Sequence, residues 1–60
     1  MKPMDAINHF GSQRKLAEAL SIHEANVSRW KDVGIIPLRR ALELSKMTDG
    51  ELDLKLSDYR

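Results

Sequence analysis

The sequence lacks cysteine and is poor in proline, glycine and aromatic residues. Its 60 residues include no Cys, two Pro, three Gly and one each of Trp, Tyr and Phe. The absence of cysteine excludes a disulfide scaffold and a thiolate metal site. The longest uninterrupted apolar run, residues 35–38, is too short for a transmembrane helix or for the core of a signal peptide.

The length and composition indicate one small globular domain spanning residues 1–60. Apolar residues make up 42% and charged residues 32% of the chain, which is a balance typical of a soluble protein. A core in so small a domain supplies about 3–5 kcal/mol of net stability. Such a chain has little room for both a core and a deep substrate pocket, so the sequence argues against an enzyme.

Charge is distributed unevenly along the chain, although the net charge is only +1. Residues 12–40 carry six basic and three acidic side chains, whereas residues 41–60 carry three basic and five acidic ones. A basic middle segment suits an anionic partner. An ordinary solvated surface shows the same imbalance, so charge alone does not identify the partner.

The spacing of apolar residues predicts an all-α fold of about five short helices. Gly11 and Gly34 are placed to end the first and third of them, and Ser12 to cap the second. The capping-box pattern from Thr48 to Glu51 predicts the start of the fifth. The expected helices cover residues 4–10, 13–20, 24–33 and 37–47 and a short segment after Thr48. The expected inner face of the fourth helix consists of Leu38, Ala41, Leu42 and Ser45.

The C-terminal tail has a competing interpretation, an α+β fold that ends in a β-hairpin. The dipeptide Asp49-Gly50 is a strong hairpin signal, and the leucines at positions 52, 54 and 56 alternate as in a strand. Residues 38–44, which precede the tail, are rich in helix formers and contain no β-branched residue, which favours a helix. The helical interpretation places Leu52, Leu56 and Tyr59 on one side.

Residues 13–30, QRKLAEALSIHEANVSRW, have the pattern of a helix-turn-helix. The turn is too short for an antiparallel hairpin, so the two helices must cross steeply. A steep crossing requires a small side chain where the helices approach most closely, and Ala17 is placed to supply it. The shared core then consists of Leu16, Leu20, Ile22, Val27 and Trp30.

This stretch resembles the Cro repressors of lambdoid bacteriophages and the related Cro/antitoxin-type regulators of prophages. The matching segments are HFGSQRKLAEALSIHEANVSRW, the link GIIP and the helical LRRALELSKMTDGEL, which together cover most of the chain. The link and tail resemble the all-helical branch of the family, whereas other Cro proteins end in a β-hairpin. The turn residue in the family is usually a left-handed glycine. Here it is Ser21, at a cost of about 1 kcal/mol.

The face of residues 24–33 that lies opposite Val27 and Trp30 carries groups able to read base edges. Successive residues turn by about 100° around a helix, which directs Ala25, Ser28 and Arg29 outward. Arginine pairs with guanine, glutamate accepts from cytosine, alanine contacts the thymine methyl group, and serine either donates or accepts. The candidates for base reading are Glu24, Ala25, Ser28 and Arg29.

Candidates for contacts with phosphate, or with the flank of the site, surround this face. They are Gln13, Arg14, Lys15, His23, Asn26, Lys31, Arg39 and Arg40. The first three begin a helix, where free backbone N–H groups attract anions. For Arg39 and Arg40, a purely solvent-facing position agrees equally well with the sequence.

The resemblance implies a repressor that occupies operator sites in double-stranded DNA in the cytoplasm of a bacterial host, with no cofactor and no metal. The helix at residues 24–33 would lie in the major groove. The alternative is a small helical protein-interaction module such as an antirepressor. A module of that kind is expected to show aromatic or large apolar anchors on the outward face, and this face has none.

The resemblance also implies a homodimer, because Cro-like repressors bind DNA in pairs. The helix-turn-helix must stay free for DNA, which leaves the link and the tail for pairing. The candidate contacts are Val33, Ile35, Ile36, Leu44, Leu54 and Tyr59. A helical tail offers no edge strand, so the contact should bury less than the roughly 1,200 Å² of a stable interface. We therefore expect a weak dimer that assembles on DNA.

Overall fold

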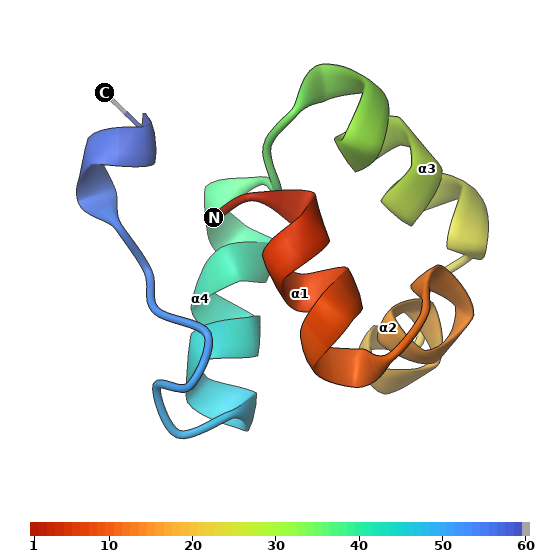
Figure 1. Ribbon diagram of the computed structural model, residues 1–60, viewed down its shortest axis with the longest axis horizontal. Helices are drawn as coiled ribbons and strands as arrows, with labels where there is room; N and C mark the ends of the chain where they lie inside the picture. Colours follow the sequence, from red (N-terminus) through yellow and green to blue (C-terminus); the bar gives the residue numbers. More distant parts are fainter. Residues whose placement is uncertain (60) are drawn as a thin grey trace.

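The computed structural model describes residues 1–59, and over that range its regular secondary structure is entirely helical (Figure 1). The α-helices are α1 (Pro3–Phe10), α2 (Gln13–Leu20), α3 (Glu24–Val33) and α4 (Leu38–Met47), followed by a short 3₁₀ helix, η1 (Leu56–Tyr59). The all-α prediction is confirmed. Residues 1–59 contain no β-strand, so the hairpin interpretation of the tail does not hold.

Local signals in the sequence set the helix boundaries, which match the predicted ones to within one residue for the four α-helices. Ser12 Oγ accepts a hydrogen bond from the backbone N–H of Lys15 at 3.1 Å and so caps α2. Gly11 and Gly34 follow α1 and α3 with φ of 99° and 93°, a left-handed conformation that glycine adopts without steric cost.

One hydrophobic core joins all four α-helices and the tail. Leu16 and Val27 supply its centre from α2 and α3, and Ile36 and Leu44 supply it from the link and α4; all four are fully buried. Trp30 is 7% exposed, as expected for a core residue rather than a platform for base stacking. The other buried members of the core are Met1, Ala6, Ile7, Ala17, Leu20, Ala41 and Leu52.

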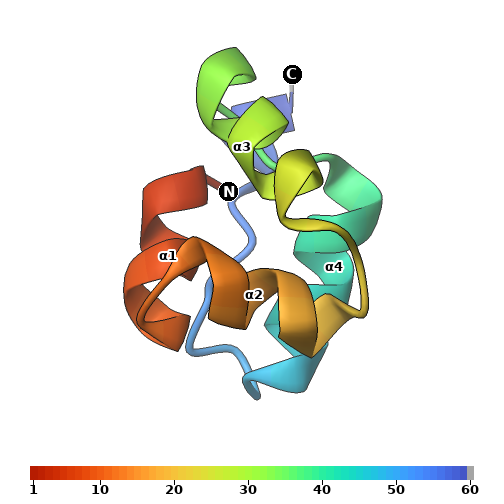
Figure 2. The ribbon, with the colours of Figure 1, turned by 90° about the vertical axis from the view of Figure 1, so that its right-hand side faces the viewer.

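The turn between α2 and α3 is tight and left-handed, as the helix-turn-helix prediction requires. Ser21 has φ 56° and ψ 43°, and the backbone N–H of Ile22 donates to the carbonyl oxygen of Ala17 at 3.0 Å. Ala17 is 3% exposed and belongs to the same buried core as Leu16 and Val27. Figure 2 shows α2 in front, with the chain turning directly from its end into α3.

The predicted inner face of α4 is partly wrong. Ala41 is buried as expected, but Leu38 and Leu42 remain 42% and 44% exposed, and Leu44 is fully buried in their place. The apolar residues of this helix form two overlapping stripes at helical spacing, one with Leu38 and Leu42 and the other with Ala41 and Leu44. Packing against the rest of the core selects the stripe of Ala41 and Leu44, and the sequence of the helix alone does not.

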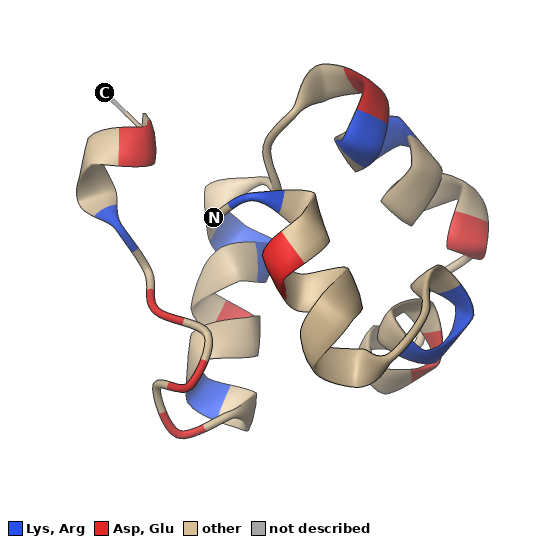
Figure 3. Cartoon of the chain, viewed as in Figure 1, with Lys and Arg blue, Asp and Glu red and all other residues tan. Residues whose placement is uncertain are grey.

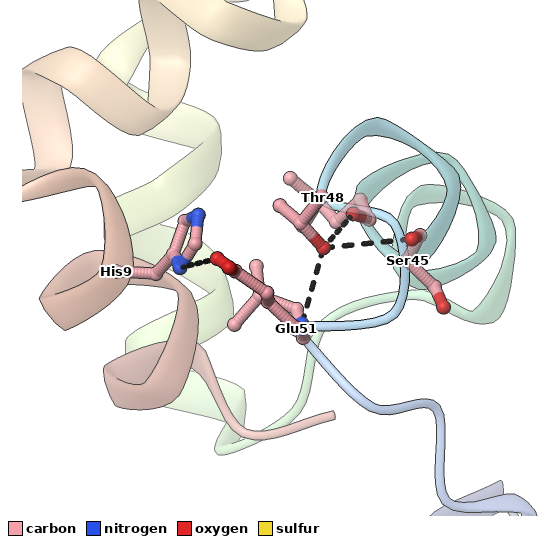
Figure 4. Close-up of polar contacts among 6 residues, drawn as sticks. His9, Ser45, Thr48 and Glu51 are labelled. Atoms are coloured by element: carbon pink, nitrogen blue, oxygen red, sulfur yellow. Dashed lines mark hydrogen bonds and ion pairs between the residues drawn. The ribbon is translucent and has the colours of Figure 1, made fainter.

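The predicted fifth helix does not begin at Thr48. Thr48 instead ends α4, because its hydroxyl donates to the carbonyl oxygen of Leu44 at 2.8 Å and accepts from the backbone N–H of Leu52 at 3.1 Å. Asp49 and Gly50 follow with positive φ, which interrupts a helix. The Glu51 carboxylate does not turn back to Thr48 but lies 3.6 Å from Nδ1 of His9 on α1 (Figure 4).

The end of the tail is fixed by Tyr59. Its phenol donates to the carbonyl oxygen of Ile36 at 2.6 Å and accepts from the α-amino group of Met1 at 2.7 Å. That amino group also lies 3.1 Å from a carboxylate oxygen of Asp58. Burial, and next the Asp58 charge, raise the pKa of Tyr59 above its ordinary value, which keeps the phenol protonated as a donor. Of the expected inner residues, Leu52 is buried but Leu56 is 66% exposed.

Among residues 1–59, no helix combines the length and the apolar character needed to cross a lipid bilayer.

Replacing the left-handed turn residue with glycine should stabilise the fold. Ser21→Gly removes the steric cost of the left-handed backbone, so we expect up to about 1 kcal/mol more free energy of unfolding. In a domain of this size, that corresponds to a rise in Tm of up to about 8 °C in thermal unfolding followed by circular dichroism. Ser21→Ala is the matched control and should bring no rise, because it keeps Cβ. Equal Tm values for the two variants would contradict this account of the turn.

Candidate nucleic-acid interface

The outward face of α3 is the part of the surface that presents the predicted base-reading residues. Its four members, Glu24, Ala25, Ser28 and Arg29, are all exposed. The opposite face of the helix is closed, since Val27 and Trp30 pack into the core. α3 lies at one edge of the molecule, away from the tail (Figure 1). None of these four residues is large and apolar; the exposed Val33 is the last residue of α3.

A chain of hydrogen bonds joins the first residue of α2 to this face. Gln13 Nε2 donates to Ser28 Oγ at 3.0 Å, and Lys31 Nζ donates to Gln13 Oε1 at 2.9 Å. All three bonded groups lie at the surface, and they come from positions 15 and 18 residues apart in the chain. The structure therefore joins Gln13 and Lys31, which are predicted to contact phosphate, to Ser28, which is predicted to read bases.

Two further basic residues stand at the start of α2 with little to restrain them. Arg14 Nε lies 3.2 Å from Glu18 Oε1, but the two side chains are 80% and 66% exposed. An exposed pair at this spacing contributes little and exchanges readily for another anion. Lys15 is exposed beside Gly11. Both cations can thus reach a phosphate without breaking a buried contact.

α4 adds arginines to the flank of α3. Arg39 and Arg40 line one surface hollow together with Asn26 and Arg29 of α3. Arg39 is exposed, whereas Arg40 is engaged with Glu43 on its own helix at 3.1 Å. The predicted residues from α3 and α4 therefore meet at the surface. His23 occupies the N-cap position of α3, exposed and with no side-chain capping bond.

The acidic residues of the C-terminal segment lie on the other side of the molecule. Figure 3 shows them in red along the tail, whereas α2, α3 and the start of α4 carry most of the basic ones. This separation follows the predicted charge imbalance between residues 12–40 and 41–60. An anion that approaches α3 consequently meets the cations of α2 and α4 and avoids the acidic tail.

Comparison with known proteins now decides the family. A family model described as "DNA-binding transcriptional regulator Cro" matches residues 2–59. The chain belongs to the Cro family of DNA-binding transcriptional regulators. It is 45% identical over 60 residues to the regulatory protein cro of Salmonella phage P22, covering all of this chain and 95% of that protein. No solved structure gives a significant match.

A second relative of this Cro-family protein is named as a repressor. It is the repressor protein of division inhibition gene dicB of Escherichia coli (strain K12), 41% identical over 63 residues. The match covers all of this chain and 82% of that protein. The predicted resemblance to phage and prophage Cro regulators is thus confirmed.

Sequence reasoning missed the long-range side-chain contacts of this Cro-family protein, of which two show why. The bond between Gln13 and Ser28 depends on the crossing of α2 and α3, and no local pattern gives it. The contact of His9 with Glu51 depends on where the tail runs after α4.

Proposed function

We propose that this Cro-family regulator represses transcription by placing α3 in the major groove of operator DNA, with residues 1–60 acting as one DNA-binding domain. The observation that carries the proposal is the outward face of α3, which is polar, exposed and free of large apolar side chains. A helix of this kind fits the major groove, where each base pair shows a distinct pattern of donors and acceptors. Bound there, the protein excludes polymerase from the promoter in the bacterial cytoplasm.

The base-reading roles follow from the chemistry of the four side chains. Arg29 pairs with O6 and N7 of guanine, and Glu24 accepts from N4 of cytosine. Ala25 contacts the methyl group of thymine. Ser28 completes the set with a hydroxyl that can donate or accept.

The phosphate contacts surround these residues on both sides. Arg14 and Lys15 bind the backbone from the start of α2, together with the free N–H groups there. Arg39 and Arg40 bind it from α4, and His23 and Asn26 add polar contacts at the flank. These groups fix the orientation of α3 but do not read sequence.

We further propose that two copies pair weakly and assemble on DNA. Two of the expected pairing residues, Ile36 and Leu44, are fully buried and belong to the core of one copy. Leu54 and Tyr59 are partly buried against that core. The remaining pairing surface is Val33, which is 68% exposed, with the half-buried Ile35 beside it. So small a patch gives a weak dimer, and simultaneous binding of two half-sites supplies the rest of the coupling.

Base reading and phosphate binding should separate in mutants. Arg29→Ala should relax the preference at one base pair per half-site and weaken binding to the best site by about 1–3 kcal/mol. Lys15→Ala should weaken all duplexes about equally and reduce the slope of log affinity against log salt by roughly one unit. The measurements are selection from a random duplex library and titration at several salt concentrations.

An unchanged consensus for Arg29→Ala would remove that residue from base reading. A changed consensus with an intact salt slope for Lys15→Ala would place Lys15 there instead. If the unmodified protein enriched no duplex at all, the proposed mode of binding would fail.

The pairing proposal predicts a mostly monomeric protein at micromolar concentration in sedimentation equilibrium, with cooperative binding to a duplex that carries two half-sites. Val33→Ser should reduce the cooperativity but leave binding to a single half-site unchanged. Leu56→Ser is the matched control, because Leu56 lies on the tail and is about as exposed as Val33. It should change neither the cooperativity nor the binding to a single half-site. A dimer with nanomolar affinity in free solution would contradict the proposal.

A further inference from the structure

We infer that Lys31 and Gln13 fix the direction of the Ser28 hydroxyl, so that Ser28 reads a hydrogen-bond acceptor on the base that faces it. The inference rests on the proposed function, because it specifies what one residue of the same face recognises. Gln13 and Lys31 are positioning residues in this account, and they act on the base through Ser28.

Lys31 sets the orientation of the Gln13 amide. An ammonium group has three donors and no acceptor, so the amide atom that meets Lys31 Nζ at 2.9 Å must be the oxygen. The nitrogen of the same amide then faces Ser28 Oγ, at 3.0 Å. The choice between the two ends of the amide is thus determined by its cationic neighbour.

The Gln13 amide in turn sets the polarity of Ser28. An amide nitrogen only donates, so Ser28 Oγ accepts this bond with one of its lone pairs. Within residues 1–59 the Ser28 hydroxyl makes no other hydrogen bond, and in particular none to the carbonyl oxygen of Glu24 one turn earlier. Its single hydrogen is therefore available on the exposed side of α3, where the proposed function places the DNA.

A hydroxyl that donates outward discriminates among bases. In the major groove, purine N7, guanine O6 and thymine O4 accept a hydrogen bond, whereas cytosine presents only the donor N4–H₂. A base with an acceptor takes up the outward hydrogen, whereas cytosine engages only the second lone pair of Ser28 Oγ and leaves that hydrogen unpaired, so cytosine should be disfavoured. If its hydrogen pointed to Gln13 instead, Ser28 would offer DNA only lone pairs, which suit the donors cytosine N4 and adenine N6.

Gln13→Glu should reverse this preference. The carboxylate has acceptors only, so one oxygen keeps the contact with Lys31 and the other takes the Ser28 hydrogen. Ser28 then presents a lone pair outward. In selection from a random duplex library with the full chain at low salt, cytosine relative to thymine at one base pair per half-site should rise about tenfold. The added charge weakens all duplexes alike, so the measured quantity is the ratio of bases and not the affinity.

Ser28→Ala with Gln13→Glu is the matched control, since it carries the same charge without the hydroxyl. Its consensus should equal that of Ser28→Ala alone. Lys31→Met should weaken the preference at the same base pair, because the amide is then free to turn over. Circular dichroism checks that each variant is folded.

The inference is overturned if Gln13→Glu keeps the original preference, or if the control double variant shifts that base pair as Gln13→Glu does. An unchanged base preference in Lys31→Met would show that Lys31 does not orient the Gln13 amide. In these cases, selection by the unmodified protein still stands, and with it the proposed function. Failure of the unmodified protein to enrich any duplex would overturn both.

Discussion

The close crossing of α2 and α3 is the constraint on which the rest of the structure depends. It requires a small side chain, Ala17, at the contact and a left-handed residue, Ser21, directly after α2. Once the crossing is made, Val27 and Trp30 enter the core and the opposite face of α3 must point outward. The same crossing brings the start of α2 beside the middle of α3, which allows Gln13 to reach Ser28.

The fold makes the proposed binding surface from short helices joined by tight turns. Ser21 holds its left-handed conformation against a steric cost, which the packing of the core on both sides of the turn offsets. The tail covers the core from the far side, held by Tyr59 and Leu52, and leaves α3 uncovered. One side of the molecule closes the core, and the other presents the polar side chains that we propose contact DNA.

The sequence predicted what depends on neighbouring residues. The bounds of α2 and α3 follow from a serine cap and a terminal glycine, and the outward residues of α3 follow from helical period alone. The sequence did not predict the features that depend on residues far apart in the chain. Packing against the rest of the core determines which face of α4 is buried. At Thr48 the hydroxyl bonds to the carbonyl oxygen of Leu44 in the preceding helix and does not cap a following one. Likewise, only the folded chain shows that Gln13 and Lys31 constrain Ser28.

The central claim, that DNA binds across α2 and α3, is tested most directly by amide chemical shifts. A ¹⁵N-labelled sample titrated at low salt with a mixed-sequence duplex should show its largest changes at residues 13–15 and 23–31, with smaller changes at residues 39–40. Residues 49–59 on the acidic tail should change little. If the largest changes fell on the tail, or on the exposed leucines at positions 38 and 42 of α4, the interface described above would be wrong.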